Sequence, residues 1–243
     1  ISALKPLRHL VPVSMEFSLL KTVDTWVFDL DNTLYPPAMR LFDQIEERMR
    51  YFVSDYLGVD LDQADILRAQ YWRSHGTTLA GMMDMHGMPP KAFLHHVHDI
   101  DFSVLSESPR LAKLIKSLPG RKIVYTNGTE PYAREVLRAR GLEQEFEDVY
   151  GIEHANYRPK PEARAFQQVF ARSKITPITS AMFEDEPRNL KVPADLGMKT
   201  IFISPDAKVP GYIDFHYIDL EACLERLVAE CFADRLNDLE LKT

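Results

Sequence analysis

The 243-residue chain has few cysteines and few glycines, and it lacks a long apolar run. Its two cysteines, Cys223 and Cys231, cannot build a disulfide framework, so we expect free, buried thiols and a reducing, cytoplasmic setting. Ten glycines without a period exclude a collagen-like chain, and the lack of low-complexity tracts excludes a disordered one. No run of about 18 apolar residues is present, so we expect no membrane-spanning helix.

The chain also lacks an excess of basic residues. Its 29 Lys and Arg against 36 Asp and Glu give a net charge of −7, which argues against nucleic acid or an anionic membrane as partner. An anionic substrate would therefore need a local cation. Residues 1–20 lack the apolar centre of a signal peptide, and Met15 is a candidate start that would make residues 1–14 an extension.

Hydrophobic patterns predict a Rossmann-like, doubly wound parallel sheet. Short apolar runs predict strands, and periodic stretches predict helices of about ten residues between them. The strands are expected over 25–30, 122–125, 147–150, 180–183 and 200–203, and the helices over 109–117, 130–140, 161–172, 186–195 and 220–236. Residues 38–98 have helical periodicity only, with helix ends at Gly58 and Gly76, so we expect an all-helical insertion after the first strand.

Polar residues gather at the predicted strand ends, where open α/β sheets bind ligands. They are Asp29, Asp31, Thr33, Thr126, Asn127, Lys160, Glu184 and Asp185. Clustered carboxylates without His or Cys favour Mg²⁺, and a carboxylate beside such a cation can attack phosphorus. A second carboxylate two residues later can protonate the leaving alcohol and then activate water. Taken singly, each group has a plain alternative, such as a helix cap, a strand-end turn or a solvated lysine.

The segment from Asp29 to Thr33 resembles the DxDxT motif of the haloacid-dehalogenase-like phosphohydrolase superfamily, and later motifs follow in the order of that family over about residues 23–205. The resemblance implies that Asp29 is a nucleophile that becomes phosphorylated and that Asp31 is the general acid and base. It further implies phosphate binding by Thr126, Asn127 and Lys160, and Mg²⁺ binding by Asp29, Asp31 (through its backbone carbonyl) and Asp185. Supporting roles fall to Thr33, to Glu184, which stands where many relatives have Asp or Gly, and to Asn189.

The stretches DLDNTLYP, GTTLAGM, VYTNGTEPYA, PKPEARAF and FEDEPRNL resemble the pyrimidine 5′-nucleotidase branch of that superfamily. This resemblance implies a small phosphorylated substrate, such as a nucleoside monophosphate, and a mobile helical cap over 37–105. Thr77 and Thr78 would lie in a cap loop that reaches the substrate. The core would then comprise 22–36 and 106–220, with a C-terminal helix over 221–243 packed on it and an N-terminal extension over 1–21.

Several alternatives stay open at this point. A related phosphatase would act on phosphoglycolate, a sugar phosphate or flavin mononucleotide, a phosphomutase would use the same two aspartates, and an inert relative would only bind its ligand. Dehalogenating relatives lack the second acid, so Asp31 favours phosphoryl chemistry. His95 and His98 share a helix face, but no further ligand is placed beside them, which disfavours a metal there. The sequence leaves monomer and homodimer equally open.

Overall fold

The computed structural model describes residues 17–205 and 208–240. Within them, six strands form one all-parallel sheet in the order β3-β2-β1-β4-β5-β6. The strands are β1 (Thr25–Phe28), β2 (Arg121–Tyr125), β3 (Asp148–Tyr150), β4 (Ser180–Glu184), β5 (Lys199–Ile203) and β6 (Phe215–Tyr217). The chain winds outward from β1 in both directions, so β1 and β4 flank the point where the winding reverses. The predicted Rossmann-like, doubly wound sheet is confirmed.

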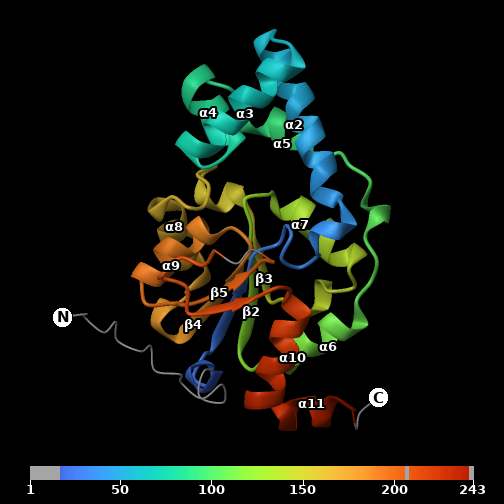
Figure 1. Cartoon of the computed structure of the whole chain (residues 1–243), viewed down its shortest axis with the longest axis vertical. Helices are drawn as coiled ribbons and strands as arrows, with labels where there is room; N and C mark the ends of the chain where they lie inside the picture. The colour runs from blue at the N-terminus through green and yellow to red at the C-terminus, as the bar shows by residue number, and fades with distance from the viewer. Residues whose placement is uncertain (1–16, 206–207, 241–243) are drawn as a thin grey trace, which may run out of the picture.

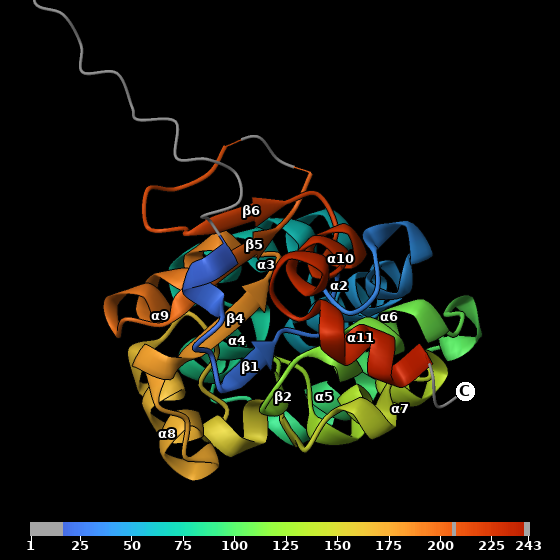
Figure 2. The same cartoon turned by 90° about the horizontal axis from the view of Figure 1, so that it is seen from below.

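Helices cover both faces of the sheet (Figure 2). Because strand side chains alternate, Trp26 and Phe28 face one layer and Val27 faces the other. The first layer contains α6 (Pro109–Ser117), α7 (Glu130–Ala139) and α10 (Leu220–Cys231), and the second contains α8 (Ala163–Ser173) and α9 (Lys191–Asp195). All four residues of β1 are buried, as expected of a central parallel strand.

Four helices form a cap beyond the carboxyl ends of the strands (Figure 1). They are α2 (Leu41–Leu57), α3 (Leu61–His75), α4 (Thr78–His86) and α5 (Pro90–Val97), and they lie in the chain between β1 and β2. Gly58 ends α2 with a φ of 66°, a conformation that glycine adopts without steric cost. Asp60 then caps α3, where its side chain accepts a 2.8 Å hydrogen bond from the Gln63 N–H. The predicted all-helical insertion is confirmed.

Several element predictions need correction. The strand β6 was not expected, because only Phe215 of its three residues is buried and no apolar run marks it. The helix expected over 161–172 begins at Ala163, and the one expected over 186–195 is a 3-10 helix, Pro187–Leu190, followed by the short α9.

The C-terminal helix expected over 220–236 is two helices, α10 and α11 (Ala233–Glu240). The break falls at Phe232, whose ring packs edge-on against Trp26 with the centroids 6.2 Å apart. The interruption therefore lets one aromatic ring reach the core from the end of α10.

The predicted N-terminal extension lies mostly outside the described residues. Its described part begins with a 3-10 helix, Phe17–Leu20, whose first and last side chains are buried. Phe17 stacks on Phe215 with the ring centroids 5.5 Å apart, so this segment belongs to the core.

Cys223 and Cys231 are free, as predicted, but only Cys223 is buried. Among the described residues, no helix combines the length and apolar character needed to cross a membrane.

Candidate active site

The carboxyl ends of β1, β2 and β4 meet below the cap and bring the predicted residues together. Asp29 and Asp31 follow β1, Thr126 follows β2, and Glu184 is the last residue of β4. A cavity of about 520 Å³ lies between this edge of the sheet and the cap. Ten of the predicted site residues line it, namely Asp29, Asp31, Thr77, Thr78, Thr126, Asn127, Lys160, Glu184, Asp185 and Asn189.

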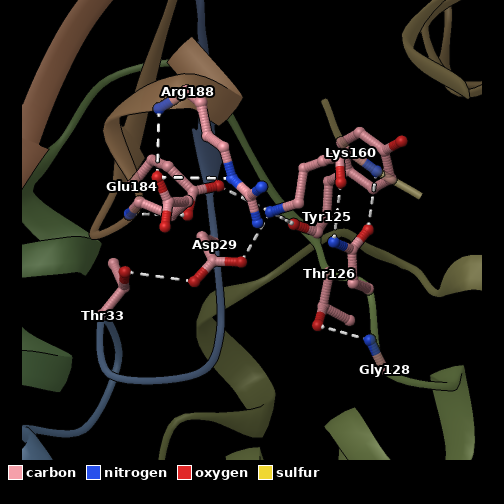
Figure 3. Close-up of polar contacts among 10 residues, drawn as sticks. Asp29, Thr33, Tyr125, Thr126, Gly128, Lys160, Glu184 and Arg188 are labelled. Atoms are coloured by element: carbon pink, nitrogen blue, oxygen red, sulfur yellow. Dashed lines mark hydrogen bonds and ion pairs between the residues drawn. The ribbon is translucent and has the colours of Figure 1, made fainter. Parts of the chain in front are cut away.

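Lys160 is the buried cation at the centre of the site (Figure 3). Its Nζ lies 2.6 Å from Asp29 Oδ1 and 2.7 Å from Glu184 Oε2, and it donates to the Tyr125 carbonyl at 3.1 Å. Burial lowers the pKa of Lys160, but the attraction of the two carboxylates outweighs it, and the net shift is upward. The lysine therefore stays charged and fixes the orientation of Asp29.

Asn127 holds the backbone of Lys160 in place. Its Oδ1 accepts from the Lys160 N–H at 2.8 Å, and its Nδ2 donates to the Lys160 carbonyl at 3.1 Å. The side chain that the sequence assigned to phosphate binding is thus already engaged. The Thr126 side chain, by contrast with Asn127, still has a hydrogen-bond donor to offer. Its Oγ1 accepts the Gly128 N–H at 2.9 Å, so its hydroxyl proton is left to donate to a ligand in the cavity that Thr126 lines.

The turn after β1 presents Asp29 to the cavity. The Asp29 N–H donates to the Phe183 carbonyl at 2.9 Å and so extends the pairing of β1 with β4 by one residue. Thr33 donates its hydroxyl to Asp29 Oδ2 at 3.1 Å. Both Asp29 oxygens therefore have a hydrogen-bond partner, one from Lys160 and one from Thr33 (Figure 3).

Three carboxylates cluster around this single ammonium group. One oxygen each from Asp29, Glu184 and Asp185 can be chosen so that all lie within 4.8 Å of one another. Burial and the charge of Glu184 raise the pKa of Asp29 to about 7, and burial and the charge of Asp29 raise that of Asp185. Excess negative charge on hard oxygen ligands fits a cation such as Mg²⁺. Asp185 is the one acid of the three that accepts no hydrogen bond from Lys160, so it is the carboxylate best placed to bind such a cation beside Asp29 and Glu184.

Asp31 stands apart from that cluster and is held by two tyrosines that sequence reasoning missed. Its Oδ1 accepts from Tyr35 at 2.7 Å and from Tyr132 at 2.5 Å. Burial raises the pKa of Asp31, and the two hydroxyls act against that rise. Both tyrosines lie inside quoted motifs, DLDNTLYP and VYTNGTEPYA, but only the fold brings residues 101 positions apart onto one oxygen.

Asn189, the predicted brace of the acidic loop, is buried beside it. Its N–H donates to the Glu186 carbonyl at 3.0 Å, whereas its side-chain Oδ1 has no partner among the described residues. A bracing role for the side chain stays a prediction.

A second group of potential metal ligands, Glu130, Glu153 and His154, lies outside the cavity. His154 Nδ1 accepts from the Gly151 N–H at 3.0 Å, so the neutral ring carries its proton on Nε2. That nitrogen faces Glu130 Oε2 at 3.5 Å. Neither nitrogen of the neutral His154 ring therefore has a free lone pair to offer a metal in this arrangement.

Arg188 ties the core to the cap, a role that the sequence did not indicate. Its guanidinium lies 3.6 Å from the centre of the Trp72 ring, and it donates to the carbonyls of Trp72 at 2.9 Å and Gly76 at 3.1 Å. Gly76 in turn lies so close to the loop of Lys160 that a Cβ added to it would meet the Pro161 ring at 3.3 Å. The cap is thus fastened directly above the buried lysine.

Replacing Arg188 with alanine is expected to loosen the cap. The lost hydrogen bonds and cation–π contact predict a destabilisation of about 1–3 kcal/mol and greater access of acrylamide to Trp72. Fluorescence quenching and thermal unfolding test this prediction, with the exposed Arg172→Ala on α8 as the control. Quenching identical to that of the wild type would show that Arg188 does not hold the cap.

Comparison with known proteins agrees with this geometry. The family model for haloacid dehalogenase-like hydrolases matches residues 23–197. Phosphate metabolism protein 8 of Saccharomyces cerevisiae is 24% identical over 192 residues, which cover 70% of this chain. The matched segment spans only 58% of the length of that yeast protein.

Solved structures support the same fold. The HAD-hydrolase YfnB of Bacillus subtilis, bound to magnesium, superposes with a TM-score of 0.58 at 17% identity, over 84% of this chain and 98% of YfnB. A HAD phosphatase of Thermococcus onnurineus gives 0.56 at 17% identity over 85% and 97%. The L-2-haloacid dehalogenase of Xanthobacter autotrophicus gives 0.55 at 16% identity over 85% and 98%. With the family model matching most of its length and the motif residues meeting at one sheet edge, the chain belongs to the haloacid dehalogenase-like hydrolase family.

Proposed function

We propose that this hydrolase is a Mg²⁺-dependent phosphomonoesterase that works through an aspartyl-phosphate on Asp29. The proposal rests on one observation, the different surroundings of two neighbouring acids. Asp29 lies among the clustered carboxylates and is oriented by Lys160, as a nucleophile must be, whereas Asp31 lies outside the cluster with hydrogen-bond donors on one oxygen. The same fold occurs in a dehalogenase, and the family resemblance of the Asp29–Thr33 motif implies that the second acid, Asp31, favours phosphoryl transfer over dehalogenation.

Hydrolysis would take two steps. Asp29 attacks phosphorus while Asp31 gives its proton to the ester oxygen, so that the P–O bond breaks and an alcohol leaves. Asp31 then takes a proton from water, which attacks the phosphorus of the aspartyl-phosphate and releases phosphate and free Asp29. Lys160 and the Thr126 hydroxyl stabilise the charge on the transferred group. A Mg²⁺ held by Asp29, Asp185 and the Asp31 carbonyl would neutralise part of the charge on nucleophile and phosphate.

We further propose a small nucleotide, such as a nucleoside monophosphate, as the substrate, and a reducing cytoplasmic compartment as the setting. Aromatic side chains from the cap, Phe42, Trp72 and Phe93, line the cavity together with Arg68. Arg68 pairs with Asp65 at 2.8 Å and offers a planar hydrogen-bonding group amid apolar walls, which suits a heterocyclic base. The two free cysteines support the proposed reducing cytoplasmic compartment, because thiols stay reduced there. The interdomain movement described for the magnesium-bound YfnB supports a cap that opens and closes.

A substrate screen tests this function. The purified protein should hydrolyse p-nitrophenyl phosphate with Mg²⁺ and should not do so in EDTA. Among natural esters, a preference for UMP and CMP is expected. A preference for phosphoglycolate would overturn the nucleotide assignment, and failure to hydrolyse any phosphomonoester would favour a binding module.

Magnesium is expected to stabilise the protein, and more strongly as the pH rises. The pKa of Asp29, raised from 3.8 to about 7, means that the metal-free fold binds a proton there that the unfolded chain loses near pH 4. Metal-free stability should therefore fall between about pH 4 and 7. Binding of Mg²⁺ needs the ionised acid. At 100 times its Kd, Mg²⁺ should raise the free energy of unfolding by up to about 2.7 kcal/mol, and this increment should grow as the pH rises through 7.

Thermal unfolding with and without Mg²⁺ at pH 6, 7 and 8 measures this increment. Asp185→Asn should remove most of it, whereas the exposed Asp55→Asn should leave it unchanged. An increment that is absent, or that shrinks as the pH rises, would contradict the assignment of the metal to these carboxylates.

A further inference from the structure

Two phenols converge on one oxygen of Asp31. Tyr35 ends the turn after β1 and Tyr132 lies in the first turn of α7, yet both donate to Asp31 Oδ1, at 2.7 and 2.5 Å. A carboxyl oxygen has two acceptor lone pairs, so these two donors occupy both of them. The other oxygen, Oδ2, is left to carry the transferable proton.

The two tyrosines act from behind the site. Of the described residues that line the cavity, Asp31 is one, but neither Tyr35 nor Tyr132 is among them. Both phenols are almost completely buried, and burial together with the charge of Asp31 raises the pKa of each hydroxyl above its ordinary value, so both are donors at neutral pH. Their hydroxyls therefore contact Asp31 but do not line the cavity that would hold the substrate.

The position of Tyr132 is fixed from the cap side. Its ring stacks on His98, with the centroids 4.2 Å apart and the planes 7° from parallel. His98 follows the last residue of α5, and its Nδ1 lies 3.2 Å from the Thr129 hydroxyl at the start of α7. One phenol of the pair is thus packed between the core and the end of the cap.

We propose that Tyr35 and Tyr132 are positioning residues that bind Asp31 Oδ1 and thereby direct Oδ2 to the leaving-group oxygen. This inference rests on the proposed phosphomonoesterase function. In the first step, the proton on Oδ2 passes to the ester oxygen as the P–O bond breaks and the Asp29–phosphorus bond forms. Asp31 is left as a carboxylate whose Oδ1 still accepts both phenols. Loss of either hydroxyl frees the carboxyl group to rotate and weakens proton delivery.

The effect should depend on how much the leaving group needs a proton. Benzyl phosphate releases an alkoxide that must be protonated, whereas p-nitrophenyl phosphate, of similar shape, releases a stable anion. Tyr132→Phe and Tyr35→Phe should each lower kcat/KM for benzyl phosphate about tenfold or more and should change that for p-nitrophenyl phosphate less than threefold. The ratio kcat/KM is used because it reports the first step and is insensitive to the later hydrolysis of the aspartyl-phosphate.

Tyr71→Phe is the matched control, because its hydroxyl makes a 2.6 Å hydrogen bond to His86 inside the cap, away from Asp31. It should leave both rates within twofold of the wild type. Equal losses with both esters, or none, in the two single variants would overturn the positioning role while wild-type turnover keeps the proposed function intact. A wild type that hydrolyses neither ester would overturn the proposed function and this inference together.

Discussion

Asp29→Asn is expected to lower phosphomonoester turnover by at least about 10⁴-fold while leaving the fold intact. The amide keeps the size of the side chain but cannot attack phosphorus, so no aspartyl-phosphate forms. The change also removes one negative charge from a cluster in which burial has raised the pKa of Asp29 to about 7. The melting temperature without metal should therefore be unchanged or higher. Steady-state kinetics and thermal unfolding on the same preparation measure both quantities.

The exposed Asp55→Asn on α2 makes the same chemical change away from the site and should keep full activity. If Asp29→Asn retained activity near that of the wild type, Asp29 would not be the nucleophile. Loss of activity together with a lower melting temperature would instead point to a structural role for the carboxylate.

Lys160→Met is expected to remove activity and to destabilise the metal-free protein by about 3–5 kcal/mol at neutral pH. The lysine is 1% exposed and is the only ammonium within hydrogen-bond distance of Asp29 and Glu184 among the described residues. Its removal leaves two carboxylates buried without their countercharge. Chemical denaturation with and without Mg²⁺ tests this prediction, and the cation should restore part of the loss.

A second substitution separates stability from catalysis at this position. Adding Glu184→Gln to Lys160→Met removes one of the unpaired charges, so the double variant should regain stability but not activity. The exposed Lys91→Met on α5 is the control for the loss of a lysine. If Lys160→Met were as stable as that control, the electrostatic account of the site would be wrong.

Sequence reasoning placed the chemistry at the correct edge of the sheet because parallel strands bring their carboxyl ends together. The acids after β1 and β4 and the threonine after β2 line one cavity for this reason. Lys160 was found by its place just before the helix expected from Pro161, since no strand precedes it directly. Its contacts with Asp29 and Glu184 depend on how the loop before α8 folds back over the sheet.

What the sequence did not reveal depends on side chains that meet only in the folded chain. Tyr35 and Tyr132 come from separate elements, and nothing in their local pattern distinguishes them from core aromatics. In the sequence, Arg188 looks like a surface cation at the start of a helix. Only the folded structure shows that Trp72 of the cap lies against its guanidinium. The strand β6 was missed because two of its three residues are only half-buried, so its sequence has no apolar run.

The most direct test of the central claim is a rapid acid quench during turnover of a ³²P-labelled phosphomonoester, followed by peptide mapping. The account predicts that label appears on the protein before phosphate reaches its steady rate of release, and that it lies on the peptide containing Asp29. Release of labelled phosphate without any labelled protein, or label on a different residue, would contradict an aspartyl-phosphate at Asp29.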